Sequence, residues 1–399
     1  MGPKFFAIRE AFMSVYLLSG ARTPSGSFLG SLSNVSAPKL GGVAISGALE
    51  KIGMSKDKVD EVFMGNVISS GIGQAPARQA SLAAGLSESV PCTTVNKVCG
   101  SGLKTIIMGA QSISAGDNSL VIAGGMENMS MAPHLIPSSR SGTKFGNAEI
   151  KDSMQWDGLW DVYSDRPMGN CAEECARKFN FTREEQDSFA IESFKKAQSA
   201  VNDGVFQSEI SPITIYGKKG ETVIDTDEGP FKANFEKVPK LRPAFEKEGT
   251  ITAANASTIN DGAAAVLLGG EEYKDLAKFK IVSYAKHAQN PTWFTTAPVE
   301  AMKKCIDKSG ISLNEVDLFE INEAFAVVTM AAIKELDLPK DKVNIFGGGV
   351  SLGHPIGCSG TRIVVTLMNA LERKNGRYGL ASICIGGGEA LALLIEKIV

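Results

Sequence analysis

The chain has 399 residues, of which 43% are hydrophobic and 21% are charged, and this length allows two or three domains around a large core. A net charge of −3 excludes a general basic field that would recruit nucleic acid or an anionic membrane, so an anionic ligand would need a local basic patch. No apolar run reaches the roughly 20 residues that a membrane-spanning helix needs.

The first residues precede a strand-like segment, and we interpret 1–12 as an N-terminal extension, a cloning remnant or a short organelle presequence. They hold one Lys, one Arg and one Glu, which is a poor transit peptide, and they contain no secretory apolar region. The final residues, Glu-Lys-Ile-Val, are not the peroxisomal tripeptide. We therefore expect a cytoplasmic protein, with the mitochondrion as the alternative.

Strand-like and helix-like hydrophobic patterns alternate along the chain, which predicts a layered α/β fold. The expected strands are Ser14–Leu18, Glu61–Gly65 and Ser119–Ala123, and the expected amphipathic helices are Ala37–Lys51 and Gly102–Ala115.

The second half of the chain repeats the first at an offset of roughly 258 residues. Val59-Asp60 matches Val316-Asp317, Gly102 at a helix start matches Gly360, and the strand at 119–123 matches one at 379–383. Three matches in the same order predict two homologous α/β halves that face each other. We expect a site where their strand-to-helix loops converge.

Residues 129–250 have a different texture, with a Trp-rich stretch, a charged helix near Thr182–Asp203 and a polar hairpin-like segment at Ile213–Asp225. We interpret them as an inserted loop domain that covers the site, the alternative being an ordinary surface insertion. The expected division is an extension (1–12), an N-terminal half (13–128 plus 251–278), a loop domain (129–250) and a C-terminal half (279–399).

Seven cysteines, an odd and scattered set, indicate reduced thiols in an intracellular compartment rather than a disulfide framework. Cys171 and Cys175 lie four residues apart on an expected helix. No second Cys or His pair follows at metal-ligand spacing, so we predict no metal site.

Two cysteines lie in glycine-rich surroundings, Cys99 in Val-Cys-Gly-Ser-Gly and Cys384 in Ile-Cys-Ile-Gly-Gly-Gly. Cys99 comes just before an expected helix, where the helix dipole and free N–H groups favour a thiolate. The alternative is a small buried cysteine with no chemical role. Two thiols near one imidazole would supply a nucleophile and two acid/base groups, which suggests carbon–carbon bond chemistry on a thioester.

A cysteine nucleophile needs a base, and the chain has three histidines. His287 lies in a polar stretch that is typical of a surface, and His134 opens the inserted segment. His354 lies in the glycine-rich run Gly-Gly-Gly-Val-Ser-Leu-Gly-His-Pro-Ile-Gly, which permits close approach to a substrate. We therefore choose His354 as the base.

Asn322 lies at the end of an expected strand, where the active sites of open α/β sheets gather. Its amide could anchor a water or donate to an oxyanion, or it could cap a helix over Glu323–Glu335. Ser257 belongs to a run of small residues, which leaves room for a long thin ligand but is equally typical of a turn.

These motifs resemble those of the thiolase family, most of all its acetoacetyl-CoA class. Asn-Lys-Val-Cys-Gly-Ser-Gly, Asn-Glu-Ala-Phe, Gly-His-Pro-Ile-Gly and Cys-Ile-Gly-Gly-Gly occur in the family's order, and the resemblance runs from about Met13 to Val399. It implies a reversible acyltransferase that condenses two acetyl-CoA to acetoacetyl-CoA and CoA. A homotetramer or dimer is implied as well, with acyl-CoA as the substrate and no permanently bound cofactor.

The resemblance also implies a role for each matched residue. Cys99 would carry the acyl group, His354 would remove its proton, and Cys384 would move the α-proton of acetyl-CoA. One oxyanion hole would combine His354 with a water held by Asn322, and another the N–H groups of Cys99 and Gly386.

Further matched residues would contact the acyl-CoA. Met168 would shorten the acyl pocket, Ser257 would lie along the pantetheine arm, and Lys232 and Lys237 would lie near the nucleotide phosphates. The contacts to the substrate would also include Ala324 and Phe325, from Asn-Glu-Ala-Phe.

Three positions depart from the family's pattern. Pro167 stands where many relatives carry a histidine, which puts one CoA contact in doubt. Phe194 stands where potassium-activated relatives carry a tyrosine, so we do not expect a potassium requirement. Glu389 replaces a small or amide residue after the last glycines, and the sequence provides no physical reason for it.

The main alternative is a broad-chain 3-ketoacyl-CoA thiolase of fatty-acid breakdown, which shares the catalytic residues and differs in pocket depth. Met168 and the loop at Trp293-Phe294 would decide between the two. A non-catalytic acyl-CoA carrier would predict the loss of Cys99 or Cys384, and both are present. A decarboxylating condensing enzyme would lack the Cys384 loop.

Overall fold

A computed structural model describes residues 14–217 and 220–398 of the chain. The expected extension at 1–12 lies outside the described residues. The elements expected from periodicity are confirmed, with shifts at their ends: β1 runs from Tyr16 to Arg22 and β5 from Leu120 to Asn128, both longer toward the C-terminus than expected.

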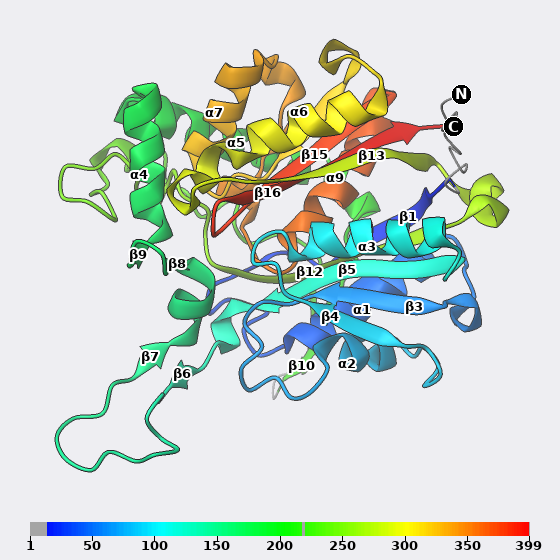
Figure 1. Cartoon of the computed structure of the whole chain (residues 1–399), viewed down its shortest axis with the longest axis horizontal. Coiled ribbons are helices and arrows are strands. Elements are labelled where there is room, and N and C mark those ends of the chain that lie inside the picture. Colours follow the sequence, from blue (N-terminus) through cyan, green and yellow to red (C-terminus); the bar gives the residue numbers. More distant parts are fainter. Residues whose placement is uncertain (1–13, 218–219, 399) are drawn as a thin grey trace, which may run out of the picture.

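One ten-stranded sheet contains most of the strands (Figure 1). Its path is β14 (Leu318–Ile321), β15 (Tyr378–Ile385), β16 (Glu389–Lys397), β13 (Phe279–Ala288), β1, β12 (Asn260–Gly269), β5, β3 (Glu61–Gly65) and β4 (Cys92–Val95), with β2 (Gly26–Ser27) paired to β12.

The sheet has the same plan on both sides of the β1–β13 contact, where Tyr16 pairs with Lys280 and Leu17 with Phe279. β1, β12, β5 and β3 are joined by antiparallel, antiparallel and parallel pairings, and so are β13, β16, β15 and β14. The predicted duplication is therefore confirmed by the topology, and the halves meet edge to edge.

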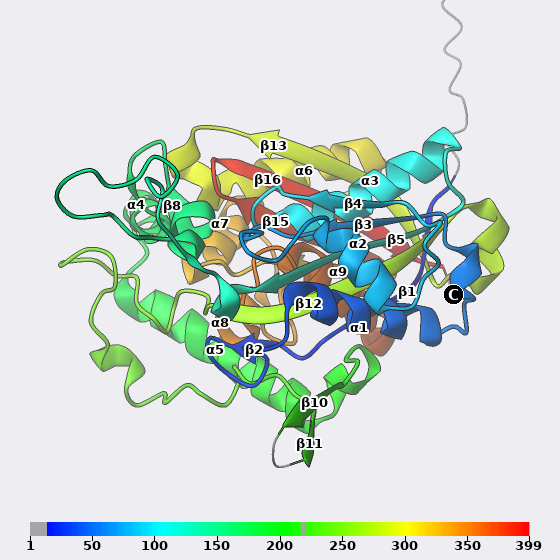
Figure 2. The same ribbon diagram turned by 90° about the horizontal axis from the view of Figure 1, so that it is seen from below.

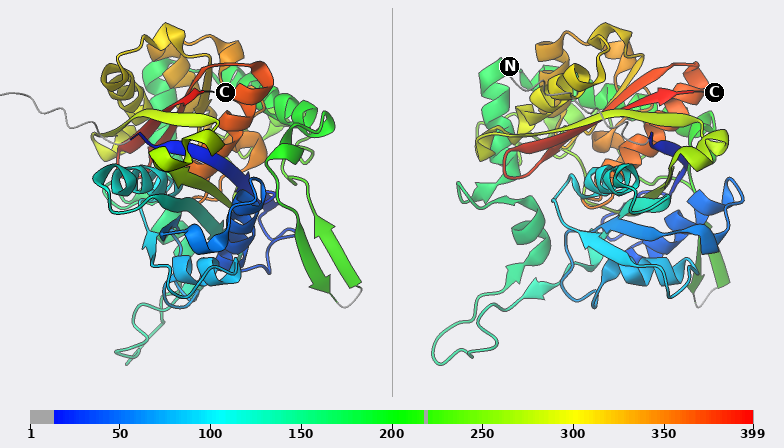
Figure 3. Two further views of the ribbon diagram at one scale, coloured as in Figure 1. Left: turned by 90° about the vertical axis from the view of Figure 1, so that its right-hand side faces the viewer. Right: turned by 45° about the vertical axis from the view of Figure 1, so that its right-hand side comes forward.

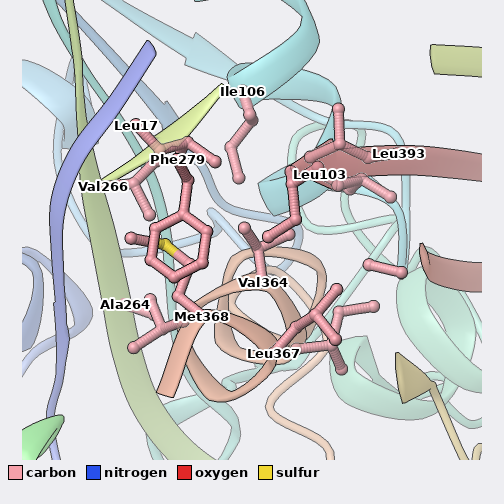
Figure 4. Close-up of a cluster of buried hydrophobic side chains, with 14 of the residues drawn as sticks. Leu17, Leu103, Ile106, Ala264, Val266, Phe279, Val364, Leu367, Met368 and Leu393 are labelled. Atoms are coloured by element: carbon pink, nitrogen blue, oxygen red, sulfur yellow. The ribbon is translucent and has the colours of Figure 1, made fainter. Parts of the chain in front are cut away.

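Two helices, α3 (Ser101–Ala115) and α9 (Ser359–Lys374), lie between the two halves of the sheet (Figure 3). The largest core cluster joins them to β1, β12, β13 and β16, and Figure 4 shows Leu103, Ile106, Val364 and Leu367 within it. The helices cross closely at glycine, because a Cβ on Gly360 would lie 2.3 Å from the backbone nitrogen of Leu103.

Further helices cover the outer faces of the two halves, as a layered α/β fold requires. In the N-terminal half these are α1 (Ala37–Glu50) and α2 (Pro76–Ala83), and in the C-terminal half they are α6 (Ala297–Ser309) and α7 (Ala326–Leu336). Among the described residues, no helix is long and apolar enough to cross a membrane.

The segment between the halves holds short strands and two helices, seen from below in Figure 2. Its elements are β6 (His134–Leu135), β7 (Lys151–Asp152), β8 (Trp160–Asp161), β9 (Arg166–Pro167), α4 (Met168–Phe179), α5 (Arg183–Asn202), β10 (Ile213–Gly217) and β11 (Gly220–Ile224). The expected helix and hairpin are thus confirmed. A capping box at Thr182 and Glu185 fixes the start of α5.

Candidate active site

Four loops carry the predicted catalytic residues, and they come from both halves of the molecule. The loop before α3 carries Cys99, the loop after β14 carries Asn322, the loop before α9 carries His354, and the turn between β15 and β16 follows Cys384. The loops approach closely at glycine positions, since a Cβ on Gly100 would lie 2.4 Å from Ile385 Cδ1. The structure therefore brings the predicted motifs together.

Cys99 is half-buried, and the backbone N–H groups of Gly386 and of Cys99 itself approach its sulfur. Burial raises the pKa of the thiol to about 11, although these two N–H groups act against the rise. The N–H groups thus favour the thiolate in the expected direction, but desolvation outweighs them. At neutral pH the thiol needs a base before it can attack.

His354 is a buried side chain in a loop that turns at Gly353, whose φ is +95°. Its Nδ1 lies 2.6 Å from Ser359 Oγ, and that hydroxyl donates to the Pro355 carbonyl at 2.9 Å. The hydroxyl oxygen then accepts a hydrogen bond from Nδ1–H, which leaves a lone pair on Nε2. Nε2 is buried and has no partner among the described residues, so it is free to act as a base.

The electrostatic surroundings of His354 favour the neutral imidazole. Burial and, to a smaller extent, the positive charge of Arg362 lower the pKa of His354 to about 3. A neutral imidazole is the form that accepts a proton from a thiol.

Asn322 follows β14 directly and is fully buried. Its backbone N–H donates to the Ser382 carbonyl at 2.9 Å, and its Nδ2 lies 3.5 Å from His354 Nδ1. Its Oδ1 has no partner among the described residues. The alternative of a helix cap is wrong, because α7 begins at Ala326 and Phe325 is its N-cap residue. The Asn322 side chain is therefore buried beside the imidazole, with one open acceptor on Oδ1.

Cys384 lies near the end of β15 with 1% of its surface exposed. Burial raises its pKa well above the ordinary value, and the negative charge of a Cys99 thiolate would raise it further. Its resting form is therefore the thiol, which can donate a proton. Phe294 and Phe325 belong to the apolar cluster around it.

The residues that we expect to contact acyl-CoA lie in three parts of the structure. The Ser257 N–H donates to the Ala324 carbonyl at 2.9 Å, which holds the small-residue run against the segment that ends in Phe325. Met168 opens α4, and a Cβ on Gly386 would lie 3.6 Å from Met168 Cε. Lys232 and Lys237 have exposed side chains.

The other two histidines stay away from this arrangement. His134 is exposed. His287 is half-buried rather than a free surface residue, with Nε2 3.0 Å from Gln289 Oε1 and Nδ1 2.9 Å from Lys304 Nζ.

Comparison with known proteins agrees with the geometry. The family model for the thiolase N-terminal domain matches residues 15–272, and that for the C-terminal domain matches 274–397. The chain belongs to the thiolase family. Acetyl-CoA acetyltransferase 2 of Arabidopsis thaliana is 51% identical to this thiolase over 96% of each chain. Acetyl-CoA acetyltransferase of Saccharomyces cerevisiae is 50% identical and covers 96% of this chain and 99% of its own.

A solved structure is similar throughout. The Acat5 thiolase of Ascaris suum, in complex with coenzyme A, matches this thiolase with a TM-score of 0.92 and 46% identity. The match covers 96% of this chain and all of that one. The predicted fold class is therefore confirmed.

Sequence reasoning missed Glu127, a fully buried carboxylate of β5. It accepts hydrogen bonds from Asn66 Nδ2 and from the N–H groups of Val67, Ile68 and Gly357, at 2.9 to 3.2 Å. Burial raises its pKa to about 7, and the backbone donors act against the rise. Glu127 thus ties the loop of His354 to the loop after β3. A lone acidic residue in an apolar strand was the available signal.

The structure also supplies a partner for Glu389. Its Oε2 lies 2.5 Å from Lys97 Nζ, with both side chains half-buried. Lys97 precedes Cys99 by two residues, and Glu389 follows the glycine turn that contains Gly386. The ion pair therefore links the loop of one half to the turn of the other.

Proposed function

We propose that this thiolase is an acetyl-CoA C-acetyltransferase, which converts two acetyl-CoA to acetoacetyl-CoA and CoA, reversibly and through an acetyl group on Cys99. The observation that carries the proposal is that the converging loops hold two protonated thiols and an imidazole whose Nε2 lone pair is free. The relatives that are named acetyl-CoA acetyltransferases, at about half identity over nearly the whole chain, support this reaction.

In the first step, His354 Nε2 takes the proton of Cys99 while the sulfur attacks the thioester carbonyl of acetyl-CoA. A bond forms between sulfur and the acetyl carbon, and the bond from that carbon to the CoA sulfur breaks. The imidazolium then gives its proton to the departing CoA thiolate. The neutral histidine is regenerated, and acetyl-Cys99 remains.

In the second step, Cys384 takes an α-proton from a second acetyl-CoA. The resulting carbanion attacks the acetyl carbon, a carbon–carbon bond forms, and the bond to the Cys99 sulfur breaks. Cys384 acts here as a thiolate, because His354 Nε2 first takes the proton of its thiol. The departing Cys99 sulfur then takes that proton from the imidazolium, which restores two thiols and a neutral imidazole. In the reverse direction His354 removes the Cys99 proton, Cys384 protonates the leaving acetyl-CoA carbanion, and the imidazolium returns a proton to Cys384.

Two groups of donors would stabilise the developing negative charges. The N–H groups of Cys99 and Gly386 would hold the oxyanion on the acetyl group, and the approach of the Gly386 N–H to the Cys99 sulfur supports this assignment. A water that donates a hydrogen bond to Asn322 Oδ1 would stabilise the enolate oxygen together with His354. Loss of one such donor typically lowers the rate about 100-fold.

The acyl-CoA would lie between the loop domain and the site. We place the pantetheine arm along Ser257, Ala324 and Phe325, because these backbone segments are joined, and the phosphates near the exposed Lys232 and Lys237. Met168 would close the acyl pocket. The two lysines would form a local basic patch that attracts the anionic substrate, although the protein as a whole is acidic.

We propose that potassium is not required. Phe194 has no phenolic oxygen, and its ring lies in an apolar cluster with Phe235, 6.3 Å between centroids. Replacing NaCl by KCl at constant ionic strength should leave the rate unchanged, and a several-fold stimulation would contradict this.

The test of the reaction is CoA-dependent cleavage of acetoacetyl-CoA beside a C8 3-ketoacyl-CoA. We expect a strong preference for the C4 substrate, and Met168→Ala should reduce that preference by raising the C8 rate. Comparable C8 rates in the unchanged protein would favour the alternative, a broad-chain thiolase of fatty-acid breakdown, with the same chemistry.

We also propose a homo-oligomer, a tetramer or a dimer. The stretch between β6 and β7 extends away from the body of the molecule (Figure 1) and exposes Ile136, Phe145 and Ile150. Light scattering gives the mass that tests this.

A cytoplasmic location stays our prediction, with the mitochondrion as the alternative, since the rat and mouse relatives are named mitochondrial.

A further inference from the structure

The buried carboxylate of Glu127, near the end of β5, accepts hydrogen bonds from two separate loops. Its Oε2 accepts from the N–H groups of Val67 and Gly357, each at 3.0 Å. Its Oε1 accepts from Asn66 Nδ2 at 2.9 Å and from the Ile68 N–H at 3.2 Å. Four donors match the four lone-pair sites of an ionised carboxylate, so a proton on Glu127 would displace one of them.

On one side the carboxylate holds the loop of His354. Gly357 follows His354 by three residues, and a Cβ on Gly357 would lie 2.7 Å from Glu127 Oε2. Glycine therefore allows the loop to approach the carboxylate. Two residues further on, Ser359 Oγ lies 2.6 Å from His354 Nδ1. In the sequence, the Gly357 N–H is thus held between the imidazole and the hydroxyl that orients it.

On the other side a short series of hydrogen bonds leads to the loop of Cys99. The Val67 carbonyl accepts a hydrogen bond from Asn96 Nδ2 at 3.3 Å, and Asn96 Oδ1 accepts one from the Val98 N–H at 3.0 Å. Val98 directly precedes Cys99 and has a φ of +46°, which a β-branched residue adopts only where its surroundings hold it. Val67 therefore connects the carboxylate to the backbone next to the nucleophile.

Apolar packing joins the same two loops. Val67 and Ile68 belong to a small buried cluster with Ile356, which follows His354 by two residues, and Cys99 packs against this cluster. The loop after β3 thus contacts the loops of both predicted catalytic residues. Its own position depends on the carboxylate that accepts three of its donors.

We propose that Glu127 is a positioning residue, which sets the imidazole of His354 against the sulfur of Cys99 by holding both loops on one carboxylate. It touches no reacting atom and acts through the position of the backbone. A displacement of about 1 Å can cost about 100-fold in rate, so small shifts of these loops matter. The proposal rests on the proposed function only for His354 as the base of Cys99.

Alkylation of Cys99 by iodoacetamide tests this in the resting protein, with and without His354. Glu127→Gln should lower the rate about tenfold to 100-fold in protein that contains His354, because an amide nitrogen would face N–H groups and displace a loop. In the His354→Ala background, which has no base to misplace, the same change should have little effect. The measurement is made at about pH 8.5, because burial raises the pKa of Glu127 to about 7 and the carboxylate is then ionised.

Glu173→Gln is the matched control for the loss of a buried acceptor. Glu173 of α4 is 1% exposed and accepts from the N–H groups of Thr250 and Ile251 at 2.9 and 2.8 Å, and these donors belong to neither loop. In urea unfolding it should lose a similar amount of stability, and its alkylation rate should show no dependence on His354.

Asn96→Asp provides a second test that does not require a change in the core, because Asn96 is exposed. The aspartate keeps an acceptor for the Val98 N–H and removes the donor to the Val67 carbonyl. If Glu127→Gln does not fold, Asn96→Asp should still lower the alkylation rate, and again only where His354 is present.

An equal change with and without His354 would overturn the proposal, since a loosened fold alters access to Cys99 whether or not the base is there. The same dependence on His354 in Glu173→Gln would also overturn it. In thiolysis, Glu127→Gln should lower kcat and leave the KM for CoA near its original value. Failure of the proposed function would look different, because the unchanged protein would not cleave acetoacetyl-CoA while the alkylation rates could still be compared.

Discussion

The two halves of this thiolase share one frame but differ at the loops that end their strands. β3 and β14 occupy corresponding positions, and each is followed directly by an asparagine. Asn66 is saturated, since its amide donates to Glu127 and to the Met126 carbonyl and accepts from Ser69. Asn322 keeps an acceptor without a partner. The duplicated position is structural in one half and open for chemistry in the other.

The helix starts differ in the same way. Before α3, Cys99 is half-buried with two N–H groups near its sulfur, whereas at the start of α9 Cys358 is 2% exposed. Burial raises the pKa of Cys358 to about 12. An identical residue type at similar places is thus half-buried in one half and fully buried in the other, and we expect only the more accessible thiol to react.

The largest expected effect separates these two thiols. Cys99→Ala should abolish the acetyl adduct in intact-protein mass spectrometry and lower thiolysis at least about 10⁴-fold, because no other nucleophile is in place. Cys358→Ala, the matched control, should keep the adduct and most of the rate. A persisting adduct in Cys99→Ala would locate the nucleophile elsewhere.

Cys384→Ala should separate the two steps of the reaction. Acylation of Cys99 should survive, because His354 is intact, while condensation should fall about 10³-fold without the acid/base thiol. Cys175→Ala, a buried thiol of the same apolar cluster, serves as the control. Burst kinetics with acetyl-CoA measure both steps, and near-normal turnover of Cys384→Ala would rule out the two-cysteine mechanism.

The asparagine pair gives the next largest contrast. Asn322→Ala should lower kcat about 100-fold with little change in unfolding, because its free Oδ1 holds a catalytic water. Asn66→Ala should instead destabilise the fold by about 1–3 kcal/mol, since Glu127 loses a donor. Thiolysis rates and urea unfolding midpoints check both. A stability loss for Asn322→Ala with an unchanged rate would reverse the assignment.

Much of this arrangement could be predicted from the sequence, because the signals are local. The repeat predicted two matching halves, and the glycines around Cys99 and His354 marked the loops that approach closely. The cap expected at Asn322 failed for a non-local reason. Phe325 is extended because Ala256 pairs with it and the Ser257 N–H donates to the Ala324 carbonyl, and α7 therefore starts later.

The remaining features depend on partners that are distant in sequence. The sequence neighbours of Cys99 indicate the helix terminus alone, whereas burial between the two halves has the larger effect on the pKa of the thiol. The hydrogen bonds that hold Glu127 come from residues at least 59 positions away in the sequence. A single sequence carries no period or motif that joins such partners.

The smallest expected effect concerns the ion pair that crosses between the halves. Glu389→Lys should lower kcat/KM a few-fold, because two ammonium groups would then push the Cys99 loop away from the Gly386 turn. Stability should change by less than about 1 kcal/mol, as for other half-exposed pairs. The exchange Lys97→Glu/Glu389→Lys should restore most of the rate, and a double-mutant cycle measures the coupling. If the exchange gives no recovery, Lys97 acts on the substrate instead of on Glu389, and the two halves are aligned by their packed helices alone.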